Sequence, residues 1–440
     1  MCINGNLKKV IANVGWMTFD KVFMLLLNLL VTVRIANHFG AYEYGNYQYA
    51  ASVVALFEIL VTFTDGRIVK KQYTNKNPDV VVASVTVNRI LFSCLSFVLG
   101  TAFVFIYNGG NEFSIMFIVL LLNAIVTNLR FGMSNRFEYL LKSQKIVIAA
   151  DVAALIGAIL RLVVVELNLS IIFISFIALI SSTINMIILY VQYRLEFRNI
   201  AKLRLDKALI IKMTKESVPL AVAASCAVIY GRCDSVMLGG MMTTAEVGIY
   251  AISVNIVNVI QILLIPIRES VYPKLIQLHS TDKKAYERRY IQISSILTWI
   301  YIAGVLFSFL VLPLLFDFLS DEYKSAFPVY QVLVIGTFFM YNAGLRAGHF
   351  TLINRGSILT WSQLISVVVN ICMNYVAINI LGMYGAALAT VITQCISLFI
   401  SNLFFGKEGR QVFVWQIKAL NPVNIIAKHN KGNGFAFCLL

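Results

Sequence analysis

The residues that could do chemistry in this chain are ionisable side chains inside or beside long apolar segments. A charged side chain at the centre of a bilayer costs about 2.5–3.5 kcal/mol on insertion scales, so each is a candidate for function. The basic candidates are Lys21, Arg34, Arg89, Arg161 and Arg232, and the acidic ones are Asp20, Glu58, Asp65, Asp151 and Asp234. Arginine chelates phosphate in a planar, bidentate way and lysine supplies a point charge, so the basic set suits an anionic ligand.

Polar side chains also follow one face of the first apolar segment. At about 100° per residue, they fall within roughly 140° of each other on a helix. They are Asn13, Asp20, Lys21, Asn28 and Arg34. We expect this stripe to face a polar cavity, because the rest of the segment is apolar. The alternative is a polar seam closed by a neighbouring helix, in which Asp20 and Lys21 neutralise each other.

Two charges mark a later apolar segment. Arg232 and Asp234 are two residues apart, and on a helix such side chains point about 200° from each other. We therefore expect them to face different surroundings, one of them the cavity. Structural pairing with other helices, or snorkelling to the interface, is the alternative for both, as it is for Arg89 and Arg161.

Amides suited to sugar hydroxyls follow in the next segment, at Asn255, Asn258 and Gln261. Gln261 lies 203 residues after Glu58, which makes the two equivalent if the chain is a duplication. Hydrogen bonding between helices is the alternative role for these amides. The four histidines and seven cysteines show neither HExxH nor CxxC spacing, and no P-loop motif is present. We therefore predict no catalytic, metal or cofactor site.

Twelve membrane-crossing helices are predicted to position these side chains. The chain of 440 residues is 59% hydrophobic and only 13% charged, about half the usual charged share, which excludes disorder and a string of soluble domains. A span needs about 20 apolar residues. The predicted spans are 11–36, 46–64, 83–107, 114–130, 146–166, 170–190, 216–238, 247–267, 291–316, 326–348, 358–381 and 383–405. The predicted fold class is an all-α integral membrane protein.

The distribution of charge predicts the orientation of these spans. Of the 36 basic residues, 30 fall in the two termini and in every second loop, whereas the other loops contain Lys324 alone. The positive-inside rule therefore places both termini in the cytoplasm. The net charge of +15 reports this orientation and needs no nucleic-acid partner.

A short repeat divides the chain into two halves. The pattern Glu-x-Gly-x-Tyr occurs at Glu43–Tyr47 and at Glu246–Tyr250, and both copies open the second span of their half from the outside. With six spans each, the halves share one orientation and are related by a pseudo-twofold axis along the membrane normal. We predict an N-terminal six-helix lobe (1–190), a cytoplasmic linker (191–215), a C-terminal six-helix lobe (216–405) and a cytoplasmic tail (406–440).

Four stretches carry a family resemblance: His38–Tyr47, Asp234–Gly240 followed by Glu246–Tyr250, Pro273–Leu275 and Leu381–Ala387. Together they resemble the polysaccharide-export branch of the MOP (multidrug/oligosaccharidyl-lipid/polysaccharide) superfamily, and within it the Wzx-type flippases of O-antigen and capsule repeat units. The resemblance spans residues 7–405 and implies a V-shaped, MATE-like pair of six-helix bundles. The first half departs from the pattern, because Glu166–Leu169 replaces a Gly-x-x-Gly-Ala turn.

The resemblance also implies a function. The protein would be a flippase, not an enzyme, in the bacterial inner membrane. It would move oligosaccharide linked to undecaprenyl diphosphate from the cytoplasmic to the periplasmic leaflet by alternating access. The basic residues would hold the diphosphate, and H⁺ or Na⁺ are the candidate coupling ions. The expected partners are the lipid-linked oligosaccharide, membrane lipids and other polysaccharide-assembly proteins.

Two alternatives stay open. A cation-coupled multidrug exporter of the same superfamily would need an acidic, aromatic pocket, to which the five intramembrane cations are poorly suited. A membrane glycosyltransferase or O-antigen polymerase would need a sizeable external loop, whereas the predicted external loops are all under about 12 residues.

Overall fold

The computed structural model describes residues 5–108, 111–197, 205–262 and 264–425 of the chain. Within these ranges, the side chains of residues 5–23, 25, 26, 108, 262 and 265–270 are outside the description. Every regular element in the described part is a helix, and it contains no strand. The predicted all-α class is therefore confirmed, and it is the form in which each segment satisfies its own backbone hydrogen bonds in lipid.

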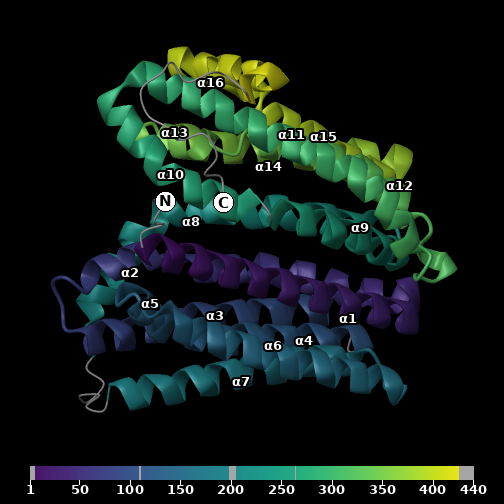
Figure 1. The fold of residues 1–440 in the computed structure, drawn as a ribbon. Helices are drawn as coiled ribbons and strands as arrows, with labels where there is room; N and C mark the ends of the chain where they lie inside the picture. Colours follow the sequence, from purple (N-terminus) through teal and green to yellow (C-terminus); the bar gives the residue numbers. More distant parts are fainter. Residues whose placement is uncertain (1–4, 109–110, 198–204, 263, 426–440) are drawn as a thin grey trace. The chain divides into compact units, whose positions relative to one another are not determined.

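Nine helical segments in the described ranges are long and apolar enough to cross a membrane (Figure 1). They are built on α3 (Pro78–Asn108), α4 (Glu112–Leu129), α6 (Ser143–Glu166), α7 (Ile172–Glu196), α8 (Lys207–Met241), α11 (Lys283–Phe316), α12 (Ala326–Asn342), α14 (Ser357–Leu381) and α15 (Met383–Leu398). Each of them overlaps one predicted span. The total of twelve and the cytoplasmic position of the termini stay predictions.

The other three predicted spans fall on helices of a different form. Segments 11–36 and 46–64 lie on α1 (Gly5–Phe57) and the 3₁₀ helix η1 (Glu58–Phe63) that follows it. Helix α1 is broken at Gly40, whose φ of 72° and ψ of 173° suit glycine alone. Segment 247–267 begins as α9 (Thr244–Ile262) and continues as α10 (Leu264–Thr281).

Short helices also occupy the basic segments between the spans. They are α2 (Gly66–Gln72), α5 (Phe131–Tyr139) and α13 (Arg346–Leu352). The 3₁₀ turns η2 (Asp321–Tyr323) and η3 (Ile400–Phe404) complete the connections. The tail contains α16 (Gly406–Ala419) and η4 (Pro422–Ile425).

The chain separates into two compact units. Unit 1 takes the described residues within Met1–Leu30, Ile252–Val369 and Ala387–Leu440, and unit 2 takes those within Val31–Ala251 and Asn370–Ala386. The predicted lobes, linker and tail were defined by topology instead of by contacts, and their boundaries stay predictions.

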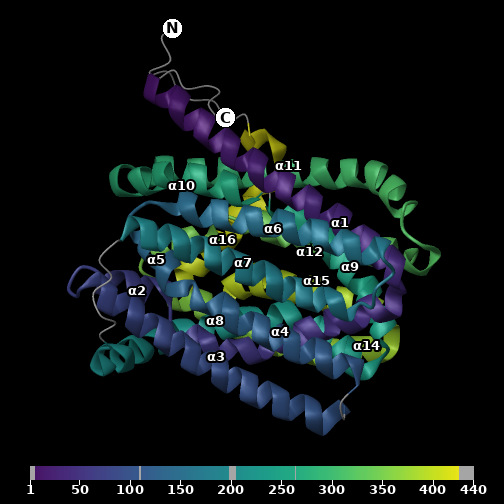
Figure 2. The same cartoon turned by 90° about the horizontal axis from the view of Figure 1, so that it is seen from below.

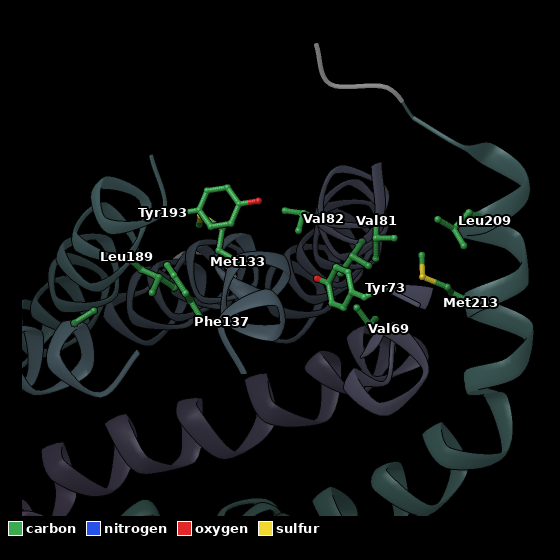
Figure 3. Close-up of a cluster of buried hydrophobic side chains, with 12 residues drawn as sticks. Val69, Tyr73, Val81, Val82, Met133, Phe137, Leu189, Tyr193, Leu209 and Met213 are labelled. Carbon is green, nitrogen blue, oxygen red and sulfur yellow. The ribbon is translucent and has the colours of Figure 1, made fainter. Parts of the chain in front are cut away.

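Unit 2 is built on neighbouring long helices. Helix α3 packs on α4, α4 on α7 and α7 on α6, and the four run side by side in both views of the ribbon (Figures 1 and 2). A buried apolar cluster, drawn from α2, α3, α5, α6, α7 and α8, joins one end of them (Figure 3). Leu209 and Met213 of α8 belong to this cluster, beside Val81 and Tyr73 (Figure 3). The first turns of α8 are therefore part of the core of unit 2.

The beginning of α8 is also tied down by a capping carboxylate. Asp206 accepts a hydrogen bond from the backbone N–H of Leu209 at 2.9 Å, and its other oxygen pairs with Lys76 at 3.1 Å. The Asp206 backbone N–H donates to the Ser84 hydroxyl at 3.2 Å. The bond from Leu209, followed by the pairing with Lys76, lowers the pKa of Asp206 from its ordinary value of 3.8.

In unit 1, the tail helix α16 packs against α11. Trp415 is buried, with its ring 4.7 Å from that of Tyr290 and 4.9 Å from that of His349. Its indole N–H donates to Glu287 at 2.9 Å. The tail carries no motif that assigns it a function, but this part of it is a structural component of unit 1.

A buried polar network extends from the same helix. Gln416 accepts a hydrogen bond from the Asn402 amide at 2.8 Å, and Asn402 in turn accepts one from Nε of Arg346 at 2.7 Å. Nη2 of Arg346 donates to the Ser362 hydroxyl at 2.7 Å. All four side chains are buried, so the network joins α16 to α13, η3 and α14.

We expect Trp415→Ala to destabilise the protein by about 3–5 kcal/mol, because it removes a buried ring and the hydrogen bond from the indole to Glu287. Thermal unfolding of the purified protein in detergent measures this effect. Trp361→Ala is the matched control, since that ring is 60% exposed. An equal loss from both variants would contradict the structural role of α16.

We expect Asp206→Ala to lower the melting temperature at pH 7, since it removes both the cap and the ion pair with Lys76. A carboxyl whose folded-state pKa is lowered stabilises the fold above its ordinary pKa, and this contribution is lost as the pH falls through the folded-state value. The difference between Asp206→Ala and the wild type should therefore shrink below pH 3.8. Asp206→Asn keeps a capping oxygen, so it should lose less stability at pH 7. A difference that does not change with pH would contradict this account.

Candidate functional site

Three of the predicted site residues come together in unit 2. Glu58 stands at the start of η1, directly after α1, and is half-buried. Its carboxylate interacts electrostatically with Arg232 of α8 and with Arg89 of α3. Arg232 itself is exposed in the described structure, so its guanidinium is available to a ligand while Glu58 supplies a counter-charge.

Arg89 also has a structural role. At the end of η1, Thr64 adopts an extended conformation that removes its carbonyl from helical hydrogen bonding. Nη2 of Arg89 donates to this carbonyl at 2.5 Å, Nη1 donates to Asn128 at 2.9 Å, and the guanidinium lies 3.4 Å above the ring of Phe131. These contacts are of the structural kind that the sequence left as the alternative for Arg89, and a direct role in binding stays a prediction.

Arg161 occupies α6 beside the tyrosine of the first repeat motif. Its positive charge interacts electrostatically with Tyr47, which lies in the second part of α1. Nε of Arg161 is buried and has no hydrogen-bond partner among the described residues. A buried donor without a partner is costly, so this position is suited to an acceptor supplied by a ligand.

Asp234 is the centre of a second polar cluster, formed by α8, α9 and α14. One carboxylate oxygen accepts hydrogen bonds from Asn374 at 2.6 Å and from Asn370 at 3.2 Å. The other accepts one from the hydroxyl of Tyr250 at 2.6 Å. Asn374 also donates to Asn370 at 3.1 Å, which connects the two amides. Asp234 is half-buried, whereas Asn370, Asn374 and Tyr250 are almost completely buried.

One acceptor in this cluster lacks a donor. The side-chain oxygen of Asn374 is buried and has no hydrogen-bond partner within the described ranges. The cluster therefore offers one carboxylate and an uncommitted amide oxygen. Within the described ranges, no three His, Cys, Asp or Glu side chains form a group that could hold a metal ion.

Asn370, Asn374 and Tyr250 are not among the site residues that the sequence predicts. The two asparagines are four residues apart in an otherwise apolar helix, so they share one face, and that spacing was a readable signal. Tyr250 was noted only as part of the repeat. The helical geometry of Arg232 and Asp234 did indicate different surroundings, and their partners differ accordingly: Glu58 for Arg232, and Tyr250 with the two asparagines for Asp234.

The polar stripe of the first span is only partly visible. The side chains of Asn13, Asp20 and Lys21 lie outside the described residues. Asn28, in unit 1, is exposed and donates to the carbonyl of Met24 at 2.8 Å.

Arg34, at the far end of the stripe, lies in unit 2. Its guanidinium forms an ion pair with Glu166 at 3.0 Å, and both side chains are about two-thirds exposed. Such an exposed pair contributes about 0–1 kcal/mol, which leaves Arg34 free to exchange partners. The role of the stripe as a cavity lining stays a prediction.

The predicted amide group lies on α9 in unit 1. Asn258 is exposed, whereas Asn255 and Gln261 are half-buried. Glu58 is in unit 2, so the equivalence of Gln261 and Glu58 within the repeat also stays a prediction.

Residues 10–279 match the family described as polysaccharide biosynthesis protein. Among curated proteins, an uncharacterized membrane protein of Methanocaldococcus jannaschii is 25% identical over 194 residues. That match covers 44% of this chain and 45% of the relative, so the chain aligns with less than half the length of that relative.

Solved transporters share the fold. An inward-facing multidrug resistance MATE family transporter of the MOP superfamily superposes with a TM-score of 0.69 at 12% identity, covering 92% of this chain and 96% of the other. The lipid II flippase MurJ, in an inward closed conformation, gives a TM-score of 0.68 at 15% identity, covering 94% of this chain and 93% of the other. At these identities the likeness concerns the fold alone. By its family match, the chain belongs to the polysaccharide biosynthesis protein family; its long apolar helices are those of a multi-pass membrane protein, and its fold is the one seen in these two transporters.

Proposed function

We propose that this protein is a flippase that carries a lipid-linked oligosaccharide diphosphate from the cytoplasmic to the outer leaflet of a bacterial inner membrane by alternating access. The observation that carries the proposal is the exposed guanidinium of Arg232 on an apolar helix of unit 2, with Glu58 as the nearby counter-charge and Arg89 fixed by hydrogen bonds at the end of η1. Two guanidinium groups kept among apolar helices, in a family of polysaccharide biosynthesis proteins, suit the diphosphate of a lipid-linked sugar.

Arg232, Arg89 and Arg161 have different roles in this proposal. Arg232 is exposed and makes the direct contact with phosphate, because a guanidinium forms two parallel hydrogen bonds with phosphate oxygens. Glu58 orients Arg232 before the substrate arrives and gives it up when phosphate binds. Arg89 holds the unwound end of η1 in place and adds positive potential. Arg161, with its uncommitted Nε, provides a further donor for the anionic head group.

The polyprenyl tail would stay in lipid while the head group crosses inside the protein. The likeness of fold to a lipid II flippase supports a lipid-linked substrate for this chain. Other polysaccharide-assembly proteins are the proposed suppliers and acceptors of that substrate. The likeness to MATE transporters leaves a multidrug exporter as the second candidate, and its organic cations would be repelled by Arg232.

We assign the coupling ion, H⁺ or Na⁺, to the Asp234 cluster. One carboxylate with neutral amide and hydroxyl oxygens matches a single positive charge, whereas divalent ions usually recruit several carboxylates. The uncommitted oxygen of Asn374 is a ready ligand beside Asp234. Binding of a cation there would release the hydrogen bonds that Asp234 now accepts, and so would change how α8, α9 and α14 are held together.

Arg232→Gln should lower transport by about tenfold or more, because a charge-assisted hydrogen bond contributes about 1.5–3 kcal/mol. The measurement is surface polysaccharide in a flippase-null strain that makes the cognate glycan, with membrane insertion verified. Lys324→Gln is the control, since Lys324 is exposed and its ion pair is with an exposed carboxylate, that of Asp321, at 2.7 Å. Normal export from Arg232→Gln and Arg161→Gln alike would contradict the phosphate assignment.

Asp234→Asn should abolish the dependence of transport on an imposed Na⁺ or pH gradient, since the neutral amide cannot balance the charge of a bound cation. Uptake of lipid-linked oligosaccharide by proteoliposomes, with each gradient applied separately, identifies the ion. Asp321→Asn is the control, because its carboxylate is exposed. An Asp234→Asn protein that keeps its gradient dependence would place the coupling site elsewhere.

A further inference from the structure

The two copies of the Glu-x-Gly-x-Tyr motif lie against each other in unit 2. The first belongs to the second part of α1, after the break at Gly40, and the second belongs to the first turns of α9. The two helices cross at the motif glycines, Gly45 and Gly248. A Cβ built on Gly45 would lie 3.0 Å from the backbone nitrogen of Gly248, and one built on Gly248 would lie 3.1 Å from that of Gly45.

The crossing leaves no room for a side chain on either glycine. A Cβ on Gly45 would lie 1.7 Å from the carbonyl oxygen of Thr244, and one on Gly248 would lie 2.3 Å from the carbonyl oxygen of Ala41. Both obstacles are backbone atoms, which cannot rotate away as a side chain can. The two helices therefore approach as closely as they do only because both positions are glycine, the device by which helices associate in lipid.

The contact is made by residues that are equivalent in the two copies of the repeat. Ala41 precedes Gly45 by four residues, and Thr244 precedes Gly248 by four residues. Each glycine thus contacts the carbonyl one helical turn before the other glycine, and the 203-residue offset relates one contact to the other. A pseudo-twofold axis that relates the two halves would pass between Gly45 and Gly248.

The tyrosine of each motif also interacts with a charged residue of the candidate site. Two residues after its glycine, the first motif places Tyr47 beside Arg161, and the second places Tyr250 against Asp234. The glycine and the tyrosine of each motif are less than one helical turn apart. A movement of the backbone at the crossing is therefore transmitted directly to Arg161 and Asp234.

We propose that the Gly45–Gly248 crossing is the closed extracytoplasmic gate of the transporter. The inference rests on the proposed alternating-access function and on the sidedness that the positive-inside rule gives to both motifs. In the closed state the two backbones touch through the glycines. In the open state they separate, and the tyrosines carry that separation to the basic and acidic clusters.

The first test adds one methyl group to each side of the gate. Gly45→Ala and Gly248→Ala should keep the crossing apart and so favour the outward-open state. Gly240→Ala is the matched control on α8, because a Cβ there meets no atom within 4 Å. The readout is labelling by a membrane-impermeant thiol reagent added from outside, in a chain whose only cysteine is Cys233, which is buried beside Asp234.

We expect both motif variants to raise the labelling rate of Cys233 by about tenfold, since overpacking of about 1–3 kcal/mol shifts an equilibrium by that order. The control should label like the parent chain. Labelling needs no substrate, so this result tests the gate even if the assigned substrate is wrong. Unchanged labelling in both motif variants, with normal insertion, would overturn the proposal.

The second test keeps both glycines and closes the gate chemically. Ala41 and Thr244 are small and flank the crossing, so Ala41→Cys with Thr244→Cys should be joined by a short reducible cross-linker. Transport by proteoliposomes should stop on cross-linking and return on reduction, whereas each single variant should be unaffected. This arm decides the matter if the alanine variants fail to insert. Full transport by the cross-linked protein would show that the crossing does not need to open.

Discussion

A polar group inside a bilayer has to find its partner within the protein, because lipid offers none, and this constraint accounts for the arrangement of unit 2. Arg89 satisfies this constraint by donating to the carbonyl of Thr64 and to Asn128 and by stacking on the face of Phe131. Asp234 meets it with three donors from two other helices. Because these partners lie far away in the chain, each polar residue determines which helices become neighbours.

The same constraint gives significance to buried polar atoms that have no hydrogen-bond partner. Nε of Arg161 and the side-chain oxygen of Asn374 are buried without a partner in the described part of the chain. Each costs stability unless something else satisfies it. The donor, near the first motif, suits an anion. The acceptor, near the second motif, suits a cation. The proposed flippase would bring both to the protein, as the substrate diphosphate and the coupling ion.

Local patterns in the sequence were sufficient for the helices but not for their pairing. Apolar length located the nine long helices, and the angle between Arg232 and Asp234 anticipated that their partners would differ. Asn374 lies 140 residues from Asp234, a separation that no helical period encodes. The tail shows a further limit. Its composition is polar and partly rich in Gly and Asn, so the sequence assigned it no function, although Val412, Trp415 and Ala419 recur at helical spacing and are buried.

The repeat motif connects these separate requirements. Glycine gives each motif a backbone surface on which the other motif packs. The tyrosine two residues later interacts electrostatically with Arg161 in the first motif and donates a hydrogen bond to Asp234 in the second. Coupling between two sites needs an element with two arrangements that both sites bias. A helix crossing that is either in contact or apart is such an element, and through the motif tyrosines it is linked to both Arg161 and Asp234. In the proposed transporter, a cation bound to Asp234 would replace the hydrogen bond that the carboxylate accepts from Tyr250, and a phosphate bound to Arg161 would draw its guanidinium from Tyr47. Both ligands would therefore act on the same crossing from opposite sides.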